Sequence, residues 1–355
     1  MLVFCVLLSD LMTIKAFSKQ LLAWYQVYHR KLPWRETNNA YFIWVSEIIL
    51  QQTRVEQGLG YYKRFLSHFP DVQSLADASE DEVLHVWQGL GYYSRARNMQ
   101  FAARQVVHDF QGMIPETYEG LMRLKGVGSY TAAAIASIAF GVPCAVLDGN
   151  VYRFLARYFG IADATDTSKG KTVFETLANK ILPKAEPGAF NQAMMEFGAL
   201  VCTPLKPACE TCIFLSTCYA YKHDLVQQLP VKIKKVQVRK RFLNFLVYQD
   251  ANGMTILEKR TGKDIWHGLY QFPLIESATD DFELEATHHQ VFVSAPQIHQ
   301  LTHQTLIARF RHIYTEKLPE KQNTVVLSIE QLKEFPLPRL ISRYIETHSE
   351  LFPGY

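Results

Sequence analysis

Apolar residues recur every three or four positions between residues 14 and 222, which is the spacing of helices with one buried face. Prolines and glycines interrupt this pattern at Pro33, Pro70, Pro115, Gly141, Gly160 and Pro187. Such residues end helices or form the turns between them. No alternating pattern typical of strands occurs in this region. We therefore predict an all-helical domain over residues 14–222.

A different pattern follows a basic segment. Residues 229–241 contain six Lys or Arg residues, which indicates a linker over residues 223–241. Two apolar runs then flank Asn252-Gly253, a dipeptide that suits the tight turn of a β-hairpin. We predict that residues 242–355 form a second domain of the α+β class, with a hairpin at its start.

Composition and charge limit the possibilities without choosing a function. The 355 residues are 48% hydrophobic, which is enough to bury two cores, and the net charge of +3 is too small to indicate a nucleic-acid partner. Residues 1–13 are apolar but are too short to span a membrane, and no basic flank precedes them. We expect an apolar or disordered extension there, no membrane association and a cytoplasmic location.

Four cysteines lie close together, with the spacing C-x6-C-x2-C-x5-C over residues 202–218: Cys202, Cys209, Cys212 and Cys218. Four thiolates can hold a tetrahedral Zn²⁺ ion or a [4Fe-4S] cluster, and the spacing alone favours neither strongly. Two disulfides or four buried thiols are the alternative. Only two other cysteines exist in the chain, and nothing suggests an oxidising compartment, so we predict a metal site.

A glycine-rich turn precedes an alanine-rich helix. Lys125, Gly126 and Gly128 stand directly before residues 129–140, so backbone amides at the positive helix terminus are left exposed. Such a terminus suits a phosphate group. An ordinary turn between two helices is the alternative interpretation.

Two carboxylates have contrasting surroundings. Glu47 is the only charged residue between Ala40 and Arg54 in an apolar helix, so burial should raise its pKa and let it act as a general acid. A structural ion pair with a distant arginine is the alternative. Asp148 precedes a helix, where the amides and the dipole should keep it ionised, although it could also be a simple N-cap. One neutral and one charged carboxyl group are typical of glycoside cleavage.

A predicted apolar stripe continues from Asp148 along one face of the following helix. Its members are Val151, Phe154, Leu155, Tyr158 and Phe159. This stripe should bury the helix and fix the position of its first turn.

Together, these motifs resemble the MutY family of adenine DNA glycosylases. The resemblance runs over nearly the whole chain from about Ala16. The matching strings are Leu32–Arg35, Trp44–Val55, Trp87–Asn98, Leu124–Thr131, Asp148–Asn150 and the four-cysteine loop. The resemblance implies a helix-hairpin-helix glycosylase core with an iron-sulfur loop, because the cysteine spacing is the one found in the endonuclease III superfamily. It favours a [4Fe-4S] cluster over zinc.

The implied activity is hydrolysis of the N-glycosidic bond of adenine mispaired with 8-oxoguanine or guanine in duplex DNA, by base flipping. A monomer is expected. Glu47 would protonate adenine and later help to activate water, Asp148 would stabilise the sugar cation, and Tyr130 and Asn150 would complete the catalytic group. The resemblance also implies DNA or adenine contacts for Arg30, Leu32, Trp34, Arg35, Gln52, Tyr92, Lys125, Gly126 and Gly128.

Two other functions remain open. Related bifunctional enzymes carry a lysine nucleophile where this chain has Tyr130, and a phenol cannot form a Schiff base, which argues against a pyrimidine-type glycosylase and lyase. A non-catalytic DNA-binding damage sensor is the second alternative.

The C-terminal residues are similar to the Nudix-like domain that recognises 8-oxoguanine in this family, with Ile265–Pro273 as the best match. No array of carboxylates for magnesium is found in residues 240–355, so we predict recognition and not hydrolysis. Thr302 and His303 stand where the family often has the sequence Phe-Ser-His. The chain lacks the intercalating ring at this place.

Overall fold

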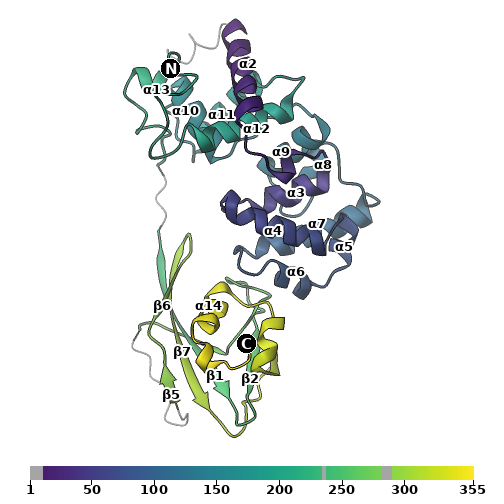
Figure 1. Ribbon diagram of the computed structural model, residues 1–355, viewed down its shortest axis with the longest axis vertical. Helices are drawn as coiled ribbons and strands as arrows, with labels where there is room; N and C mark the ends of the chain where they lie inside the picture. Colours follow the sequence, from purple (N-terminus) through teal and green to yellow (C-terminus); the bar gives the residue numbers. More distant parts are fainter. Residues whose placement is uncertain (1–10, 234–236, 281–289) are drawn as a thin grey trace. The chain divides into compact units, whose positions relative to one another are not determined.

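The computed structural model describes residues 11–233, 237–280 and 290–355, and it divides into two compact units (Figure 1). The first unit contains residues up to Gly58 and residues 105–234. The second unit contains residues 59–104 and everything from Lys235 onward. Part of the predicted helical domain therefore clusters with the C-terminal residues.

Residues 11–233 form helices and no strand, as the hydrophobic pattern predicts. The elements are α2 (Leu11–Tyr28), η1 (Pro33–Arg35), α3 (Ala40–Ile49), α4 (Val55–His68), α5 (Val72–Asp77), α6 (Glu80–Val86), α7 (Ser94–Asp109), α8 (Tyr118–Met122), α9 (Ser129–Phe140), α10 (Gly149–Phe159), α11 (Ser168–Ile181), α12 (Pro187–Leu200) and α13 (Tyr219–Lys222). Several start at a side chain that accepts bonds from the first free amides, including Asn39, Ser79, Thr117 and Thr167.

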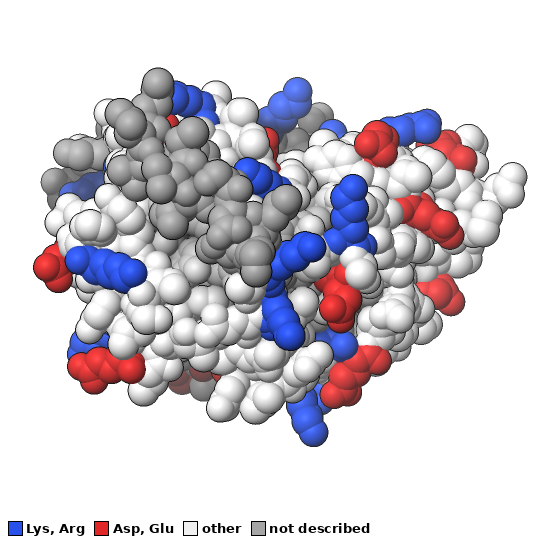
Figure 2. All heavy atoms as spheres, turned by 90° about the horizontal axis from the view of Figure 1, so that it is seen from above, with Lys and Arg blue, Asp and Glu red and all other residues white. Residues whose placement is uncertain are grey.

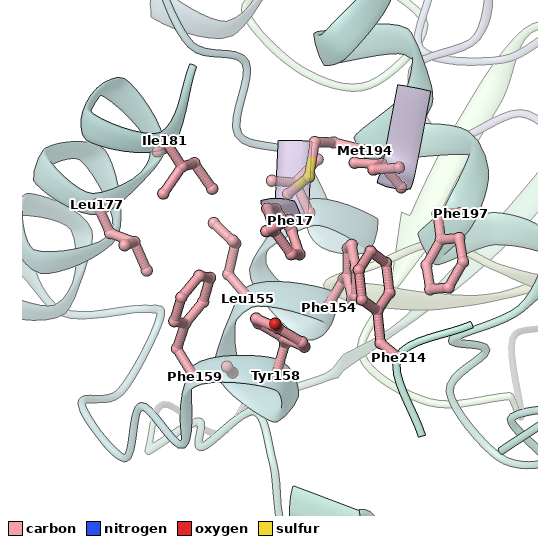
Figure 3. Packing of buried hydrophobic residues seen from close by; sticks show 14 of the residues in the cluster. Phe17, Phe154, Leu155, Tyr158, Phe159, Leu177, Ile181, Met194, Phe197 and Phe214 are labelled. Carbon is pink, nitrogen blue, oxygen red and sulfur yellow. The ribbon is translucent and has the colours of Figure 1, made fainter. Parts of the chain in front are cut away.

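An aromatic core fixes α10 in the first unit, and Figure 3 shows its side chains converging from several elements. The predicted stripe of α10 is confirmed, because all five of its residues are buried in this cluster. The ring of Phe154 lies 4.6 Å from that of Phe197 and 5.7 Å from that of Phe214. Burial of large rings supplies much of the stability of such a core, and it holds the first turn of α10 in place.

The glycine-rich turn joins α8 to α9 as a hairpin between two helices. Gly126 has a φ of 77°, a conformation that side chains rarely adopt. Gly128 is the N-cap of α9 and supplies no side-chain bond, so the first amides of this helix have no side-chain cap. Lys125, Gly126 and Gly128 are exposed.

The C-terminal part of the second unit contains two sheets and a helix. The elements are β1 (Arg239–Gln249), β2 (Met254–Lys259), β3 (Tyr270–Gln271), β4 (Leu274–Ser277), β5 (Gln290–Val293), β6 (Gln297–Gln300), β7 (Gln304–Tyr314), β8 (Thr324–Ser328), η2 (Ile329–Glu334), α14 (Arg339–Thr347) and η3 (Ser349–Leu351). One sheet has the order β4-β1-β7-β5, with β6 also paired to β7, and the other has the order β3-β2-β8. The ring of Phe310 stacks on that of Tyr344 of α14.

The predicted hairpin over β1 and β2 is wrong, although its turn forms. Gly253 has a φ of 72°, and the Asp250 amide donates to the Met254 carbonyl across the turn. However, β1 pairs with β7 in parallel and with β4 in antiparallel orientation, so both of its edges are occupied. The strand β2 instead pairs with β3 and β8 in the other sheet.

The ends of the predicted segments fall partly outside the described residues. The predicted extension over residues 1–13 is described only from Leu11, where α2 begins, and residues 234–236 of the predicted linker are not described. The strand β1 starts at Arg239, shortly before the predicted domain boundary at residue 242. None of the described helices has both the length and the apolar character needed to cross a bilayer.

Candidate active site

A cavity of about 180 Å³ lies in the first unit, and eight of the predicted site residues line it. They are Arg30, Leu32, Trp34, Arg35, Glu47, Tyr130, Asp148 and Asn150. They come from η1 and the residues before it, α3, the start of α9 and the start of α10. Helices remote in sequence thus bring two carboxyl groups, a phenol, an amide and two guanidinium groups to one enclosed space.

Glu47 is buried in α3, with 7% of its surface exposed. Its pKa is raised to about 7, mainly by burial. The nearby Asp148 contributes to this rise, whereas a hydrogen bond with Tyr130 and the charge of Arg35 act in the opposite direction. The prediction of a desolvated Glu47 is therefore confirmed. A carboxyl group with this pKa can exchange a proton near neutral pH.

Asp148 is the N-cap of α10. Its two carboxylate oxygens accept hydrogen bonds from the Val151 amide and from Nδ2 of Asn150, each 2.7 Å long. Burial raises the pKa of Asp148, which differs from the effect expected of the helix terminus alone, and these hydrogen bonds act against the rise. Both bonds are donated to the carboxylate, so they favour its ionised form.

Asn150 links Asp148 to a buried arginine. The Nη2 atom of Arg153 donates to Oδ1 of Asn150 at 2.9 Å and to the Gly198 carbonyl at 2.7 Å. Its Nε atom donates to the Cys202 carbonyl at 2.7 Å. The first turn of α10 is therefore connected through Arg153 to α12 and to the start of the cysteine loop.

The sequence analysis missed Glu196, which lies in the same cavity with its side chain 1% exposed. Its Oε2 atom forms ion pairs with Nη2 of Arg30 at 2.6 Å and with Nη2 of Arg35 at 2.7 Å. Burial alone would raise the pKa of Glu196, but hydrogen bonds from both arginines lower it to about 2. Gln192 of α12 also lines the cavity.

A signal for Glu196 does exist in the sequence. It is the only charged residue in the apolar helix Pro187–Leu200, which is the same pattern that singles out Glu47.

The other predicted site residues do not line this cavity. Gln52 lies just after α3 with a φ of 58°, and Lys125, Gly126 and Gly128 lie in the hairpin before α9. Tyr92, Thr302 and His303 belong to the second unit. There the Tyr92 hydroxyl forms a hydrogen bond with the Thr302 hydroxyl, at the turn between β6 and β7.

The four cysteines of the loop line a second, separate cavity, together with Arg157 and aromatic residues of the core. All four are free thiols, so the disulfide alternative does not hold in this structure. The pKa of the Cys212 thiol is raised to about 11, mainly by burial and in smaller part by the neighbouring cysteines. The Nη1 atom of Arg157 donates to Sγ of Cys202 at 3.5 Å. The structure thus gathers the four thiols around one cavity beside a cation, although no group of three or more candidate ligands among the described residues is arranged to hold a metal ion.

Two family models match the chain. One describes the HhH-GPD superfamily of base excision DNA repair proteins and matches residues 45–183, and the other describes the NUDIX domain and matches residues 244–347.

Curated relatives are adenine DNA glycosylases. The protein of Buchnera aphidicola subsp. Schizaphis graminum is 38% identical over 77% of this chain and 78% of its own length. Those of Rattus norvegicus and Homo sapiens are 47% and 45% identical over 61% and 63% of this chain, and 44% and 42% of their own lengths.

Solved structures agree on the fold. A thermostable thymine-DNA glycosylase superposes with a TM-score of 0.55 at 29% identity, covering 59% of this chain and 97% of that one. A trapped endonuclease III–DNA covalent intermediate gives a TM-score of 0.53 at 24% identity, covering 60% of this chain and 98% of that one. The matched part of this chain thus shares its fold with DNA glycosylases.

Proposed function

The chain belongs to the adenine DNA glycosylase family, as a DNA N-glycosylase of base excision repair, and we propose that it releases adenine mispaired with 8-oxoguanine or guanine in duplex DNA. The observation that carries this proposal is the enclosed cavity in which a carboxyl group with a pKa of about 7 lies near a hydrogen-bonded carboxylate. A flipped base must be enclosed in this way before its glycosidic bond is broken.

Glu47 acts as the general acid in this proposal. Its carboxyl proton passes to a ring nitrogen of adenine, the bond between that base and C1′ of the sugar breaks, and the bonding electrons leave with the base. The sugar is left with a positive charge, which the Asp148 carboxylate stabilises. Water then attacks C1′ and gives its proton to the Glu47 carboxylate, which restores the acid.

Tyr130 and Asn150 position the two carboxyl groups. Tyr130 forms a hydrogen bond with Glu47, and Asn150 donates to Asp148. Among the described residues, no lysine lines the cavity, and Tyr130 carries a phenol instead of an amine, so the proposed reaction ends at hydrolysis without a Schiff base. A bifunctional lyase would be covalently trapped on its substrate by borohydride, and we expect no trapped product here.

The proposed adenine pocket combines charged guanidinium groups with apolar side chains. Leu32 and Trp34 are buried beside the Arg30 and Arg35 guanidinium groups, and Glu196 holds these two groups in place. Hydrogen-bonding groups in a dry pocket discriminate strongly between bases, because a wrong base leaves them unpaired. We propose that this segment recognises adenine.

The hairpin, together with Gln52 and Tyr92, provides the proposed contacts to the duplex. The uncapped amides of α9 suit a phosphate of the backbone, next to Lys125, Gly126 and Gly128. Exposed side chains such as Gln52 and Tyr92 can fill the space that the flipped base leaves.

The Nudix-like residues are proposed to recognise the oxidised base through Thr302 and His303. Both side chains are exposed at the turn between β6 and β7, where they can donate and accept hydrogen bonds.

We also propose that the cysteine loop holds a [4Fe-4S] cluster, with Cys202, Cys209, Cys212 and Cys218 as its ligands. A single zinc ion requires four sulfur atoms at about 2.3 Å from one point. The spacing C-x6-C-x2-C-x5-C, which resembles that of the endonuclease III superfamily, supports a cluster of several irons over a single zinc ion. Its role would be to organise the loop.

Metal analysis tests the cluster. The purified protein should be brown, with broad visible absorption from thiolate-bound iron and about four irons per chain. Cys212→Ser should lose colour and thermal stability together, whereas Cys144→Ser, at a cysteine outside the loop, should keep its iron. One zinc and no iron per chain would contradict the assignment.

The variant Glu47→Gln tests the catalytic proposal. The amide keeps the shape of the side chain but cannot donate a proton as an acid, so adenine release from an 8-oxoguanine:adenine duplex should fall by at least about a thousandfold. Affinity for the duplex should persist. The measurement is strand cleavage by alkali after a single turnover, and full activity in this variant would remove Glu47 from the mechanism.

A further inference from the structure

Three cavities surround the first turn of α10, and neighbouring cavities share a residue. Tyr130 lines both the adenine cavity and a second cavity of about 320 Å³. Tyr152 lines that second cavity and a third one of about 720 Å³. A series of hollows therefore leads from Glu47, past Tyr130 and over Tyr152, to the far side of α10.

The third cavity carries a local excess of positive charge. Lys171 and Lys232 lie exposed at this cavity, and the buried Arg153 and Arg157 line it as well. None of these four cations forms an ion pair with a carboxylate among the described residues. The two arginines donate mainly to neutral carbonyl oxygens, such as those of Gly198 and Leu229.

Among the described residues, a single acidic residue, Asp166, lines this cavity, and it accepts hydrogen bonds from the Ile233 amide at 3.1 and 3.2 Å. Four cations beside one carboxylate leave an excess of positive charge. This excess of positive charge is local to the cavity. On the face of the molecule that Figure 2 shows, Lys and Arg side chains are mixed with Asp and Glu, in agreement with the small net charge of +3.

We propose that this cavity is a binding surface for the phosphate backbone of the strand that carries the flipped adenine. Asp148 marks the position of the sugar, and Gly149, the next residue, already lines the basic cavity. The strand would pass over Tyr152 and place one or two phosphates against Lys171 and Lys232. The inference rests on the proposed reaction with duplex DNA, and it adds a backbone contact on the side of α10 away from the hairpin.

The salt dependence of binding tests the surface. Each lysine that contacts a phosphate releases counterions, so Lys171→Gln and Lys232→Gln should each weaken binding and lower the slope of log Kd against log salt by about one. Lys169→Gln is the matched control, because Lys169 lies on the same helix, is paired with Asp163 and does not line the cavity. The probe is a duplex with 8-oxoguanine opposite 2′-fluoro-2′-deoxyadenosine, which resists cleavage.

A neutral methylphosphonate, introduced at one position at a time in the adenine strand and then in the opposite strand, locates the contact. At the contacted position, the wild-type protein should lose affinity and Lys171→Gln should lose no more. Both lysine variants behaving like Lys169→Gln would overturn the inference, and so would a methylphosphonate effect found only on the opposite strand. Failure of the wild-type protein to release adenine from an 8-oxoguanine:adenine duplex that carries neither the 2′-fluoro group nor a methylphosphonate would instead overturn the proposed function. The two failures can therefore be told apart.

Discussion

At the scale of single residues, the site depends on the difference between two carboxyl groups. Burial raises the pKa of both, but only Asp148 has an amide and an Asn side chain that donate to its oxygens. Glu47 lies in an apolar helix with one phenol as its hydrogen-bonding neighbour. The result is one carboxyl group that can hold a proton near neutral pH and one whose contacts favour the anion.

Such an arrangement reduces the stability of the protein, and the sign of this effect can be tested. The pKa of Glu47 is about 7 in the folded state and close to 4.5 when unfolded. The folded state therefore binds the proton more tightly, and stability is lost as the pH rises from about 4.5 to about 7, by up to about 3 kcal/mol. The variant Glu47→Gln cannot ionise and avoids this loss.

We predict that Glu47→Gln raises Tm by several degrees at pH 8 and changes it little at pH 4.5. Thermal unfolding followed by circular dichroism at both pH values measures the difference. The exposed Glu36→Gln variant is the control, and it should show the same small effect at both pH values. Equal Tm shifts of Glu47→Gln at pH 4.5 and pH 8 would contradict a buried, neutral Glu47.

The sequence reveals such residues when a lone charge interrupts an apolar helix. This signal predicts Glu47, and the same signal exists for Glu196, whose partners Arg30 and Arg35 lie far away in sequence. Ion pairs between distant segments cannot be derived from spacing, because they depend on how α12 packs in the fold. The chemistry of Glu47 was therefore predictable, whereas the ion pairs of the adenine pocket required the structure.

At the scale of elements, the position of α10 depends on a close approach to α12. A Cβ atom added at Gly198 would lie 2.7 Å from both Cβ and the carbonyl oxygen of Asn150, and no flexible side-chain end is available to move aside. Only glycine fits this crossing. The same crossing aligns Asn150 with Asp148, so packing between two helices sets the geometry of the site.

We predict that Gly198→Ala lowers adenine release by at least about tenfold and also destabilises the protein, because overpacking at such a contact costs about 1–3 kcal/mol. Gly60→Ala in α4 is the control, since nothing lies within 4 Å of a Cβ atom at that position. Its activity should stay unchanged and its stability should rise slightly. Single-turnover rates and Tm measure both effects, and an active, stable Gly198→Ala would show that the helices can separate without harm.

Helices and strands differ in how far the sequence predicts them. The helical pattern of residues 14–222 follows from local spacing, and the apolar stripe of α10 identifies a face that is buried in the structure. The turn at Asn252-Gly253 is also local and forms as expected. Strand pairing is not local, since β1 finds its parallel partner in β7, and a good turn signal alone cannot exclude that partner.

At the scale of the whole molecule, the second unit brings together two segments that are distant in sequence and that both have proposed roles at the lesion. The hydroxyl groups of Tyr92 and Thr302 are hydrogen-bonded, and Tyr92 has a φ of 49°, a conformation unusual for a tyrosine. In the same unit, Asp81 of α6 accepts hydrogen bonds from Nζ of Lys259 at 2.7 Å and from the Tyr270 hydroxyl at 3.2 Å. The family relationship covers both segments, but only coordinates reveal this contact.

We predict that Tyr92 and Thr302 act as a pair in recognising the oxidised base. A hydrogen bond contributes about 0.5–1.5 kcal/mol, so Tyr92→Phe and Thr302→Ala should each lower the preference for 8-oxoguanine:adenine over guanine:adenine by about two- to tenfold. The double variant should lose no more than the stronger single one, because both changes remove the same interaction. The ratio of single-turnover rates on the two duplexes measures this preference. Thr305→Ala, on the same hairpin but bonded to Gln300, is the matched control and should leave the ratio unchanged. If the two losses multiplied in the double variant, the residues would act independently, and the contact would have no part in recognition.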